Sequence, residues 1–242
     1  MSVRQVAATN VVGTTLVATF GASTLAGSVI SVFVCGAFGS SPPPVSDNQS
    51  TSYGSPKASA QHLANSERAW CWCGVPPSAG VTAVTLSPGS APGDVTLAVV
   101  ELTGRNTTSP VTTALGRDAF TPPTTTDGTT VGPITAASGD DLVLFLADTA
   151  AVHTSNYNAG TGWTEWAQTG SATGSGLVGF TGALESVSAG SITATATADT
   201  TDSTIGLLMA IAQGGGGGGT VGRLVGGTLC GGVLVGGLLT GF

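Results

Sequence analysis

The stretch Ser-Ile-Thr-Ala-Thr-Ala-Thr at residues 191–197 alternates hydroxyl and apolar side chains. Successive side chains of a strand point to opposite faces, so this pattern predicts a β-strand with one buried face. Four other runs are almost continuously apolar and are bounded by Gly, Pro, Asp or Ser, which predicts buried strands. No stretch keeps a 3.6-residue period with capping residues. The sequence therefore predicts an all-β fold, an antiparallel β-sandwich, whose apolar strands cover 29–38, 95–102, 141–147 and 205–212.

An internal sequence repeat predicts pseudo-repeated halves at 26–103 and 138–213. Gly27 and Gly139 each open an apolar strand, and Ser-Ala-Gly precedes a Thr-rich strand at 78–80 and again at 188–190. Two arrangements fit: one jelly-roll-type sandwich over residues 1–213, or two small sandwiches in tandem. Each half alone is small for an independent core, which favours the single sandwich.

Composition argues against a nucleic-acid-binding protein. The 242 residues include six Lys and Arg against thirteen Asp and Glu, for a net charge of −7. Phosphate binding begins from a basic patch, and these basic residues are scattered. Only 8% of residues are charged, but 41% are apolar, so a core can still form. The basic residues are Arg4, Lys57, Arg68, Arg105, Arg117 and Arg223.

The N-terminal region is uncharged between Arg4 and Asp47, which raises the alternative of a signal peptide or membrane segment. A signal peptide has one compact apolar stretch, whereas the apolar residues here form short β-branched runs. The longest run, 29–38, falls short of the roughly 20 residues that span a bilayer. We therefore expect strands here, and a membrane role is disfavoured.

Cysteines and histidines do not follow the spacing of a metal site. Cys71 and Cys73 are two apart, so both side chains lie on one face of a strand. Cys-x-Cys with the isolated His62 and His153 is poor evidence for zinc. The sequence predicts buried free thiols, no metal and no cofactor.

No catalytic constellation is visible, and we predict that the protein is not an enzyme. The sequence has no nucleophile elbow and no phosphate-binding loop. Glu101, Glu165 and Glu185 are conceivable glycosidase carboxylates, but strand ends and exposed turns explain them better. Asp140-Asp141 and the pair Asp199 and Asp202 are expected in solvated turns, because a calcium loop needs more ligands.

Four residues near one loop–strand junction are candidates for glycan contact. Aromatic side chains at loop tips can stack on sugars, but aromatic rings more commonly fill or cap a core, which is the favoured interpretation. The candidates are His153, Tyr157, Trp163 and Trp166.

The C-terminal region has two parts. Residues 214–219 are all glycine and predict a flexible linker. Residues 220–242 form an apolar arm with a five-residue period closed mostly by Gly-Gly. A membrane helix packed through Gly-x-x-x-Gly is one interpretation, but glycine is costly in helices. A segment that docks on another subunit or self-associates is favoured, with candidate contacts Leu224, Leu229, Leu234, Leu239 and Phe242.

Three short turn-forming motifs resemble a known module. They are Val45–Asn48 after a proline turn, Val99–Gly104 at a strand end and Ala159–Thr164 before an aromatic strand. Together they resemble a β-sandwich module of bacteriophage virion proteins and some bacterial surface proteins, over about residues 5–213. Where that module has an aromatic turn, this chain has Leu102-Thr103, so no chemistry transfers there.

The resemblance implies an accessory virion protein without an inherited active site. The expected function is capsid decoration or a minor tail role in a particle assembled in the host cytoplasm. Its expected partners are capsid or tail subunits and further copies of itself. A carbohydrate-binding or adhesive module that contacts a host surface glycan is the alternative function.

Overall fold

The computed structural model consists almost entirely of β-strands. Its described residues include one 3-10 turn, Leu63–Asn65, and no α-helix. Within each sheet, all paired strands are antiparallel. The predicted all-β antiparallel sandwich is confirmed. The residues that the structure describes are 3–12, 14–89, 94–121, 129–148, 157–169, 179–199, 203–214, 232–234 and 239–241.

The first half of the chain forms one five-stranded and one three-stranded sheet. Their strand orders are β1-β8-β3-β6-β5 and β2-β7-β4. The bounds are β1 (Val3–Val12), β2 (Leu16–Thr19), β3 (Val29–Gly36), β4 (Val45–Asp47), β5 (Ala58–His62), β6 (Glu67–Gly74), β7 (Ala83–Leu86) and β8 (Asp94–Leu102).

The second half repeats this arrangement. Its sheets run β13-β14-β11-β16-β9 and β10-β15-β12, which are the orders of the first half with eight added to each strand number. The bounds are β9 (Val111–Phe120), β10 (Thr129–Ala136), β11 (Asp141–Asp148), β12 (Tyr157–Ala159), β13 (Thr164–Thr169), β14 (Gly179–Leu184), β15 (Gly190–Ala198) and β16 (Thr204–Ile211).

The repeated glycines predicted from the sequence occupy equivalent turns. Gly27 and Gly139, before β3 and β11, have φ of 73° and 86°. Gly80, ahead of β7, and Gly190, at the start of β15, have φ of 110° and 145°. A positive φ is accessible to glycine at little cost, so the same residue recurs where the same turn recurs.

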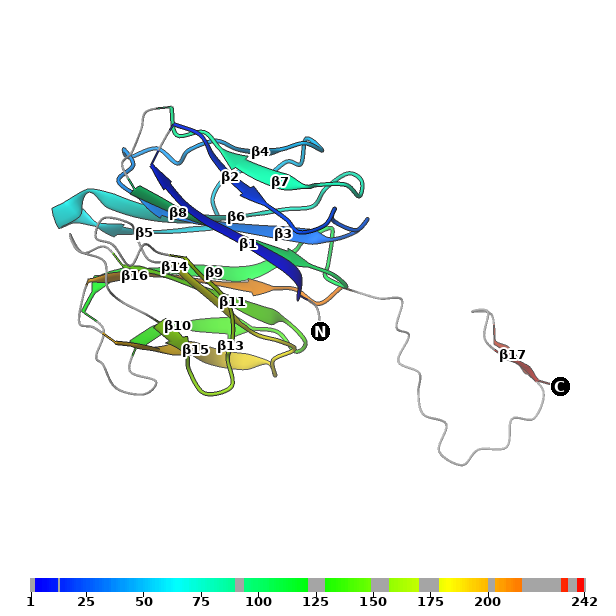
Figure 1. The fold of residues 1–242 in the computed structure, drawn as a ribbon. Coiled ribbons are helices and arrows are strands. Elements are labelled where there is room, and N and C mark those ends of the chain that lie inside the picture. Colours follow the sequence, from blue (N-terminus) through cyan, green and yellow to red (C-terminus); the bar gives the residue numbers. More distant parts are fainter. Residues whose placement is uncertain are drawn as a thin grey trace.

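Four sheets stack into layers, with the first half on one side and the second on the other (Figure 1). Each three-stranded sheet packs on the five-stranded sheet of its own half, and this gives each half its own core. A third core lies between the two five-stranded sheets. At its centre the rings of Phe33 and Phe145 stack with their centroids 5.7 Å apart.

The two halves pack on each other as the subunits of a twofold dimer do. Strand β1 lies against β13, and β5 lies against β9. Since β9 and β13 are the second-half counterparts of β1 and β5, both contacts join the same pair of elements, the mark of an isologous interface. Phe33 and Phe145 are also counterparts. Each half is small for an independent core. The face of its five-stranded sheet that its own three-stranded sheet leaves uncovered packs against the other half.

The alternation of β6 sends its side chains into two different cores. Trp70 and Trp72 face the three-stranded sheet of the first half. Cys71 and Cys73 face the second half.

Beyond the stacked sheets, the structure describes two short strands of the C-terminal region. Strands β17 (Gly232–Leu234) and β18 (Leu239–Gly241) pair antiparallel, with Leu234 opposite Leu239. The other docking candidates, Leu224, Leu229 and Phe242, lie outside the described residues.

Candidate functional site

The aromatic residues predicted as glycan contacts belong to the protein core wherever the structure describes them. Tyr157 is 1% exposed, and its hydroxyl is 2.7 Å from the Thr204 hydroxyl. Trp163 is buried, and Trp166 packs partly buried against the central core. His153 lies outside the described residues. The rings of Tyr157 and Trp163 therefore present no open face on which a sugar could stack, in keeping with the core interpretation.

Three cysteines are buried free thiols, as predicted. Cys35, Cys71 and Cys73 line the core between the two halves, and Cys230 lies outside the described residues. Burial raises the pKa of Cys71 and of Cys73 to about 12 and raises the pKa of Cys35 well above its usual value. The thiolate is the reactive form of cysteine, so these three side chains act as small apolar groups at neutral pH.

This burial predicts the thiol reactivity of the folded protein. In a Cys230→Ser variant we expect no fast reaction with Ellman's reagent in native buffer, because all three remaining thiols are buried and protonated. In guanidinium, where the chain is unfolded, all three thiols should react with the reagent. Fast labelling of any thiol in the native variant would contradict this packing of the halves.

Glu101 is a buried structural carboxylate rather than a group at an exposed turn. Its side chain is 0% exposed near the end of β8. It accepts hydrogen bonds from Arg4 Nη1 (2.7 Å), Gln5 Nε2 (2.6 Å), the Leu25 backbone N–H (2.8 Å) and the Ser28 hydroxyl (2.6 Å). Burial acts to raise the pKa of Glu101, but these four hydrogen bonds outweigh it, and the pKa lies below its usual value. Glu101 thus ties the edge strand β1 and the β2–β3 loop to the sheet.

Asp140 and Asp141 are also buried, which corrects the expectation that they lie in a solvated turn. Asp140 accepts a hydrogen bond from the Ala137 N–H, and Asp141 accepts one from the Ser186 N–H. Asp141 Oδ2 also lies 3.2 Å from Arg105 Nε. Both carboxylates therefore hold nearby backbone in place, and Asp141 also holds Arg105 of the connection between the two halves. Asp199 is exposed, and Asp202 lies outside the described residues.

The connection between the halves holds the start of the glycine run. Arg105 donates to the Gly139 carbonyl at 2.8 Å, and the backbone N–H of Asn106 donates to Ala212. The Gly214 N–H donates to the Gly104 carbonyl at 3.0 Å. Gly214 is therefore held in place beside this connection.

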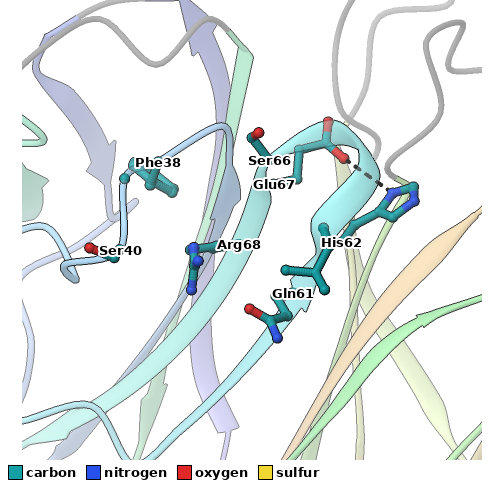
Figure 2. Close-up of a pocket in the computed structure, with 9 residues that line it drawn as sticks. Phe38, Ser40, Gln61, His62, Ser66, Glu67 and Arg68 are labelled. Atoms are coloured by element: carbon teal, nitrogen blue, oxygen red, sulfur yellow. Dashed lines mark ion pairs between the residues drawn. The ribbon is translucent and has the colours of Figure 1, made fainter.

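Two adjoining hollows lie on the β5–β6 hairpin, which is the strongest candidate site in the described structure. The first is about 290 Å³ and opens at the turn of the hairpin (Figure 2). The second is about 270 Å³ and reaches across to β9. Gln61 and Arg68 line both. The first hollow is also lined by Phe38, Gly39, Ser40, His62, Leu63, Ser66 and Glu67, and the second by Ser59, Ala60, Trp70 and Asp118.

Strand pairing divides the polar residues of the hairpin between two faces. Gln61 is paired with Arg68, and His62 is paired with Glu67. Adjacent residues of a strand point to opposite faces, so Gln61 and Arg68 share one face while His62 and Glu67 share the other. His62 Nδ1 lies 3.8 Å from Glu67 Oε2. Both pairs still border the first hollow, because the hollow opens at the turn where the two faces of the hairpin meet.

Sequence reasoning did not identify Arg68 as a site residue, although its pattern held the signal. The alternation from 68 to 73 places Arg68 on the same face of β6 as Trp70 and Trp72. A guanidinium on the tryptophan face of a strand is unusual enough to mark the position. Pairing with Gln61, which depends on the register of the hairpin, could not be derived from this pattern alone.

Other classes of site find no support in the described ranges. There, no three His, Cys, Asp or Glu side chains gather in a group that could hold a metal ion. Within the same ranges, no helix has the length and apolar character needed to cross a bilayer. Comparisons with family models, curated proteins and solved structures give no match to this chain. Function must therefore be argued from geometry.

Proposed function

We propose that the protein is a structural, accessory component of a bacteriophage particle, a capsid-decoration or minor tail protein. The observation that carries this proposal is a stack of four sheets in which Gly214 is held by a hydrogen bond to Gly104, followed in the sequence by an apolar, glycine-rich segment. The strand orders support the jelly-roll assignment. In the first half β1, β8, β3 and β6 are neighbours in one sheet and β2, β7 and β4 in the other, and the counterpart strands of the second half are arranged in the same way. The short turn motifs of the sequence point to the same setting.

The arm is the proposed attachment device. Residues 220–242 carry no charge except at Arg223, and their leucines recur every five residues. A segment so short and so rich in glycine buries little on its own, so it gains stability by ordering on another surface. The proposed partners are capsid or tail subunits and further copies of this chain.

Replacement of the arm leucines tests this proposal. In the full chain, we expect Leu224, Leu229, Leu234 and Leu239 all changed to Ser to reduce co-sedimentation with particles assembled without the protein. The expected loss is about tenfold or more, since each truncated leucine removes about 1.5–3 kcal/mol of apolar burial. A matched control changes Thr220, Thr228 and Thr240 to Ser and should bind as the original chain does. Equal incorporation of the leucine variant would refute docking through the arm.

A carbohydrate-binding or adhesive role is the second candidate function. Burial of Tyr157 and Trp163 takes two of the four residues first considered for it out of reach of a ligand. The observation that favours it now is the polar hollow around Arg68, which has amide, hydroxyl and guanidinium groups on its walls.

A further inference from the structure

We propose that the hollows around Arg68 form a binding site for a saccharide that carries a carboxylate group. This site goes beyond the structural role proposed above and does not depend on the arm. Its recognition element is the Arg68 guanidinium, with Gln61 and the hydroxyls of Ser40 and Ser66 as partners for sugar hydroxyls.

Arg68 is a half-buried cation without a partner in the part of the chain that the structure describes. Arg4 pairs with Glu101, and Arg105 pairs with Asp141. Arg117 donates to Thr130 and lies 3.5 Å over the ring of Phe120. Lys57 is exposed to solvent. Among the described residues, Arg68 makes no side-chain hydrogen bond or ion pair.

An unpartnered guanidinium is costly where it loses water. Partial burial of a charge is unfavourable unless hydrogen bonds or an opposite charge replace its hydration. Arg68 differs from the exposed Lys57 in being half-buried, so a bound anion would replace hydration that Arg68 has lost. Binding sites commonly keep such groups at the expense of stability.

The neighbours of Arg68 also leave room for a ligand. In the sheet, Arg68 has Gln61 on one side and Gly36 on the other. Gly36 has no side chain to fill the space. After Gly36 the chain turns sharply, with the Phe38 N–H donating to the Gly36 carbonyl at 2.8 Å. Figure 2 shows the Arg68 side chain between Ser40 on one wall and Gln61 on the other.

The aromatic residues beneath the site make it rigid. Phe38 and Trp70 meet edge to face, with ring centroids 5.3 Å apart, and both are almost fully buried. They form the floor of the hollows rather than an open stacking platform. The second hollow has mainly polar walls, and the first combines polar groups with the exposed side chain of Leu63, so together they suit a ligand with hydroxyl groups and an apolar ring face.

The charges around the hollows select one carboxylate rather than a polyanion. A guanidinium fork matches a carboxylate with two parallel hydrogen bonds. Asp118 lies across the second hollow, where its Oδ1 accepts the Gln61 N–H at 2.9 Å, and its carboxylate can also accept from a sugar hydroxyl. With Glu67 nearby and a net charge of −7, a nucleic acid or phosphate chain would be repelled. Hollows of about 290 and 270 Å³ suit one sugar ring each.

Calorimetry with the full chain tests this site. The probes are 3′-sialyllactose, methyl galacturonoside and a disaccharide with a single glucuronate, each beside its methyl ester, together with acetate and inorganic phosphate. We expect saturable binding of at least one acidic saccharide, and binding of its neutral ester should be weaker by about tenfold, the loss of one charge-assisted pair. Arg68→Gln should weaken binding by a similar factor. Arg68→Lys should be intermediate, because it keeps the charge but loses the fork.

Lys57→Gln is the matched control, because it removes the same charge from an exposed position at the edge of the same sheet. It should change affinity less than twofold, about the size of a surface effect. Thermal unfolding separates binding from structure: Arg68→Gln should not lower Tm, since Arg68 loses no internal partner. Absence of saturable binding across the panel, retention of affinity in Arg68→Gln, or equal competition by acetate and phosphate would each overturn the proposal.

Discussion

Glu101→Gln is expected to lower the free energy of unfolding by about 1–3 kcal/mol, the cost of leaving buried hydrogen-bonding groups unsatisfied. The carboxylate of Glu101 accepts from four donors, two of them on β1. The amide group of glutamine would present an N–H to donors that include the backbone N–H of Leu25, which cannot reverse its direction. Arg4 would also lose its carboxylate partner. Urea denaturation, followed by tryptophan fluorescence, measures the change.

Glu165→Gln is the matched control for this prediction. It makes the same chemical change at an exposed position of β13. Surface changes of this kind stay within about 0.5 kcal/mol. A loss of equal size in both variants would show that the buried hydrogen bonds of Glu101 contribute nothing specific.

The same residue predicts how stability depends on pH. Because the pKa of Glu101 is lower in the folded than in the unfolded chain, the unfolded chain binds more protons between the two pKa values. The contribution of Glu101 is therefore fully present above its unfolded pKa of about 4.3 and is lost as the pH falls through the folded pKa. Asp47, whose pKa is also lowered, acts in the same direction. Glu101→Gln should flatten the acid side of the stability curve without abolishing its slope.

The alternating strand and the repeated turns were predictable from the residues alone, because burial of one strand face and a positive φ each restrict which residues can occur. The alternating stretch at 191–197 lies in β15, where Ala194 and Ala196 face the core and the threonines lie between. The repeated turns were predictable because glycine at a positive φ leaves a visible mark in the sequence.

The stacking of the halves has a sequence signal of a different kind. A two-layer sandwich exposes one face of each sheet, so its strands alternate. All eight residues of β3 and all eight of β11 are buried, because each lies in a sheet covered on both faces. The continuous apolar runs at 29–38 and 141–147 thus carried the information that two sheets lie in the interior of the stack. The partner of each covered face could not be derived, since it depends on contacts between residues more than a hundred positions apart.

The buried carboxylates show where sequence reasoning stops. Glu101 and Asp141 resemble ordinary strand-end acids in sequence, and only the fold brings Arg4 to the one and Arg105 to the other. The same limit applied to the candidate site. Aromatic residues suggested Trp163, which the fold buries, whereas the uncommitted group is the guanidinium of Arg68.

Gly116→Ala is expected to weaken the packing of the two halves on each other. Gly116 lies in β9, opposite Leu207 of β16, where β9 passes against β5 of the other half. A Cβ at this position would overlap the carbonyl oxygen and carbon of Ser59. These are backbone atoms of a paired strand, so they cannot move aside without disturbing the β5–β6 ladder. The cost should reach or exceed the upper end of the 1–3 kcal/mol typical of overpacking, about 3 kcal/mol.

The form of the unfolding curve makes this prediction specific to the interface. Each half has its own core beneath its three-stranded sheet, so loosening the contact between the halves should turn one cooperative transition into two. Gly21→Ala is the control, because a Cβ there meets nothing within 4 Å, and it should leave a single transition within about 0.5 kcal/mol of the original. Probes in the two halves, Trp72 and Trp163, report each transition separately when the other tryptophans are replaced by phenylalanine. A single transition with unchanged midpoint in Gly116→Ala would mean that the close approach of β5 and β9 does not couple the two halves.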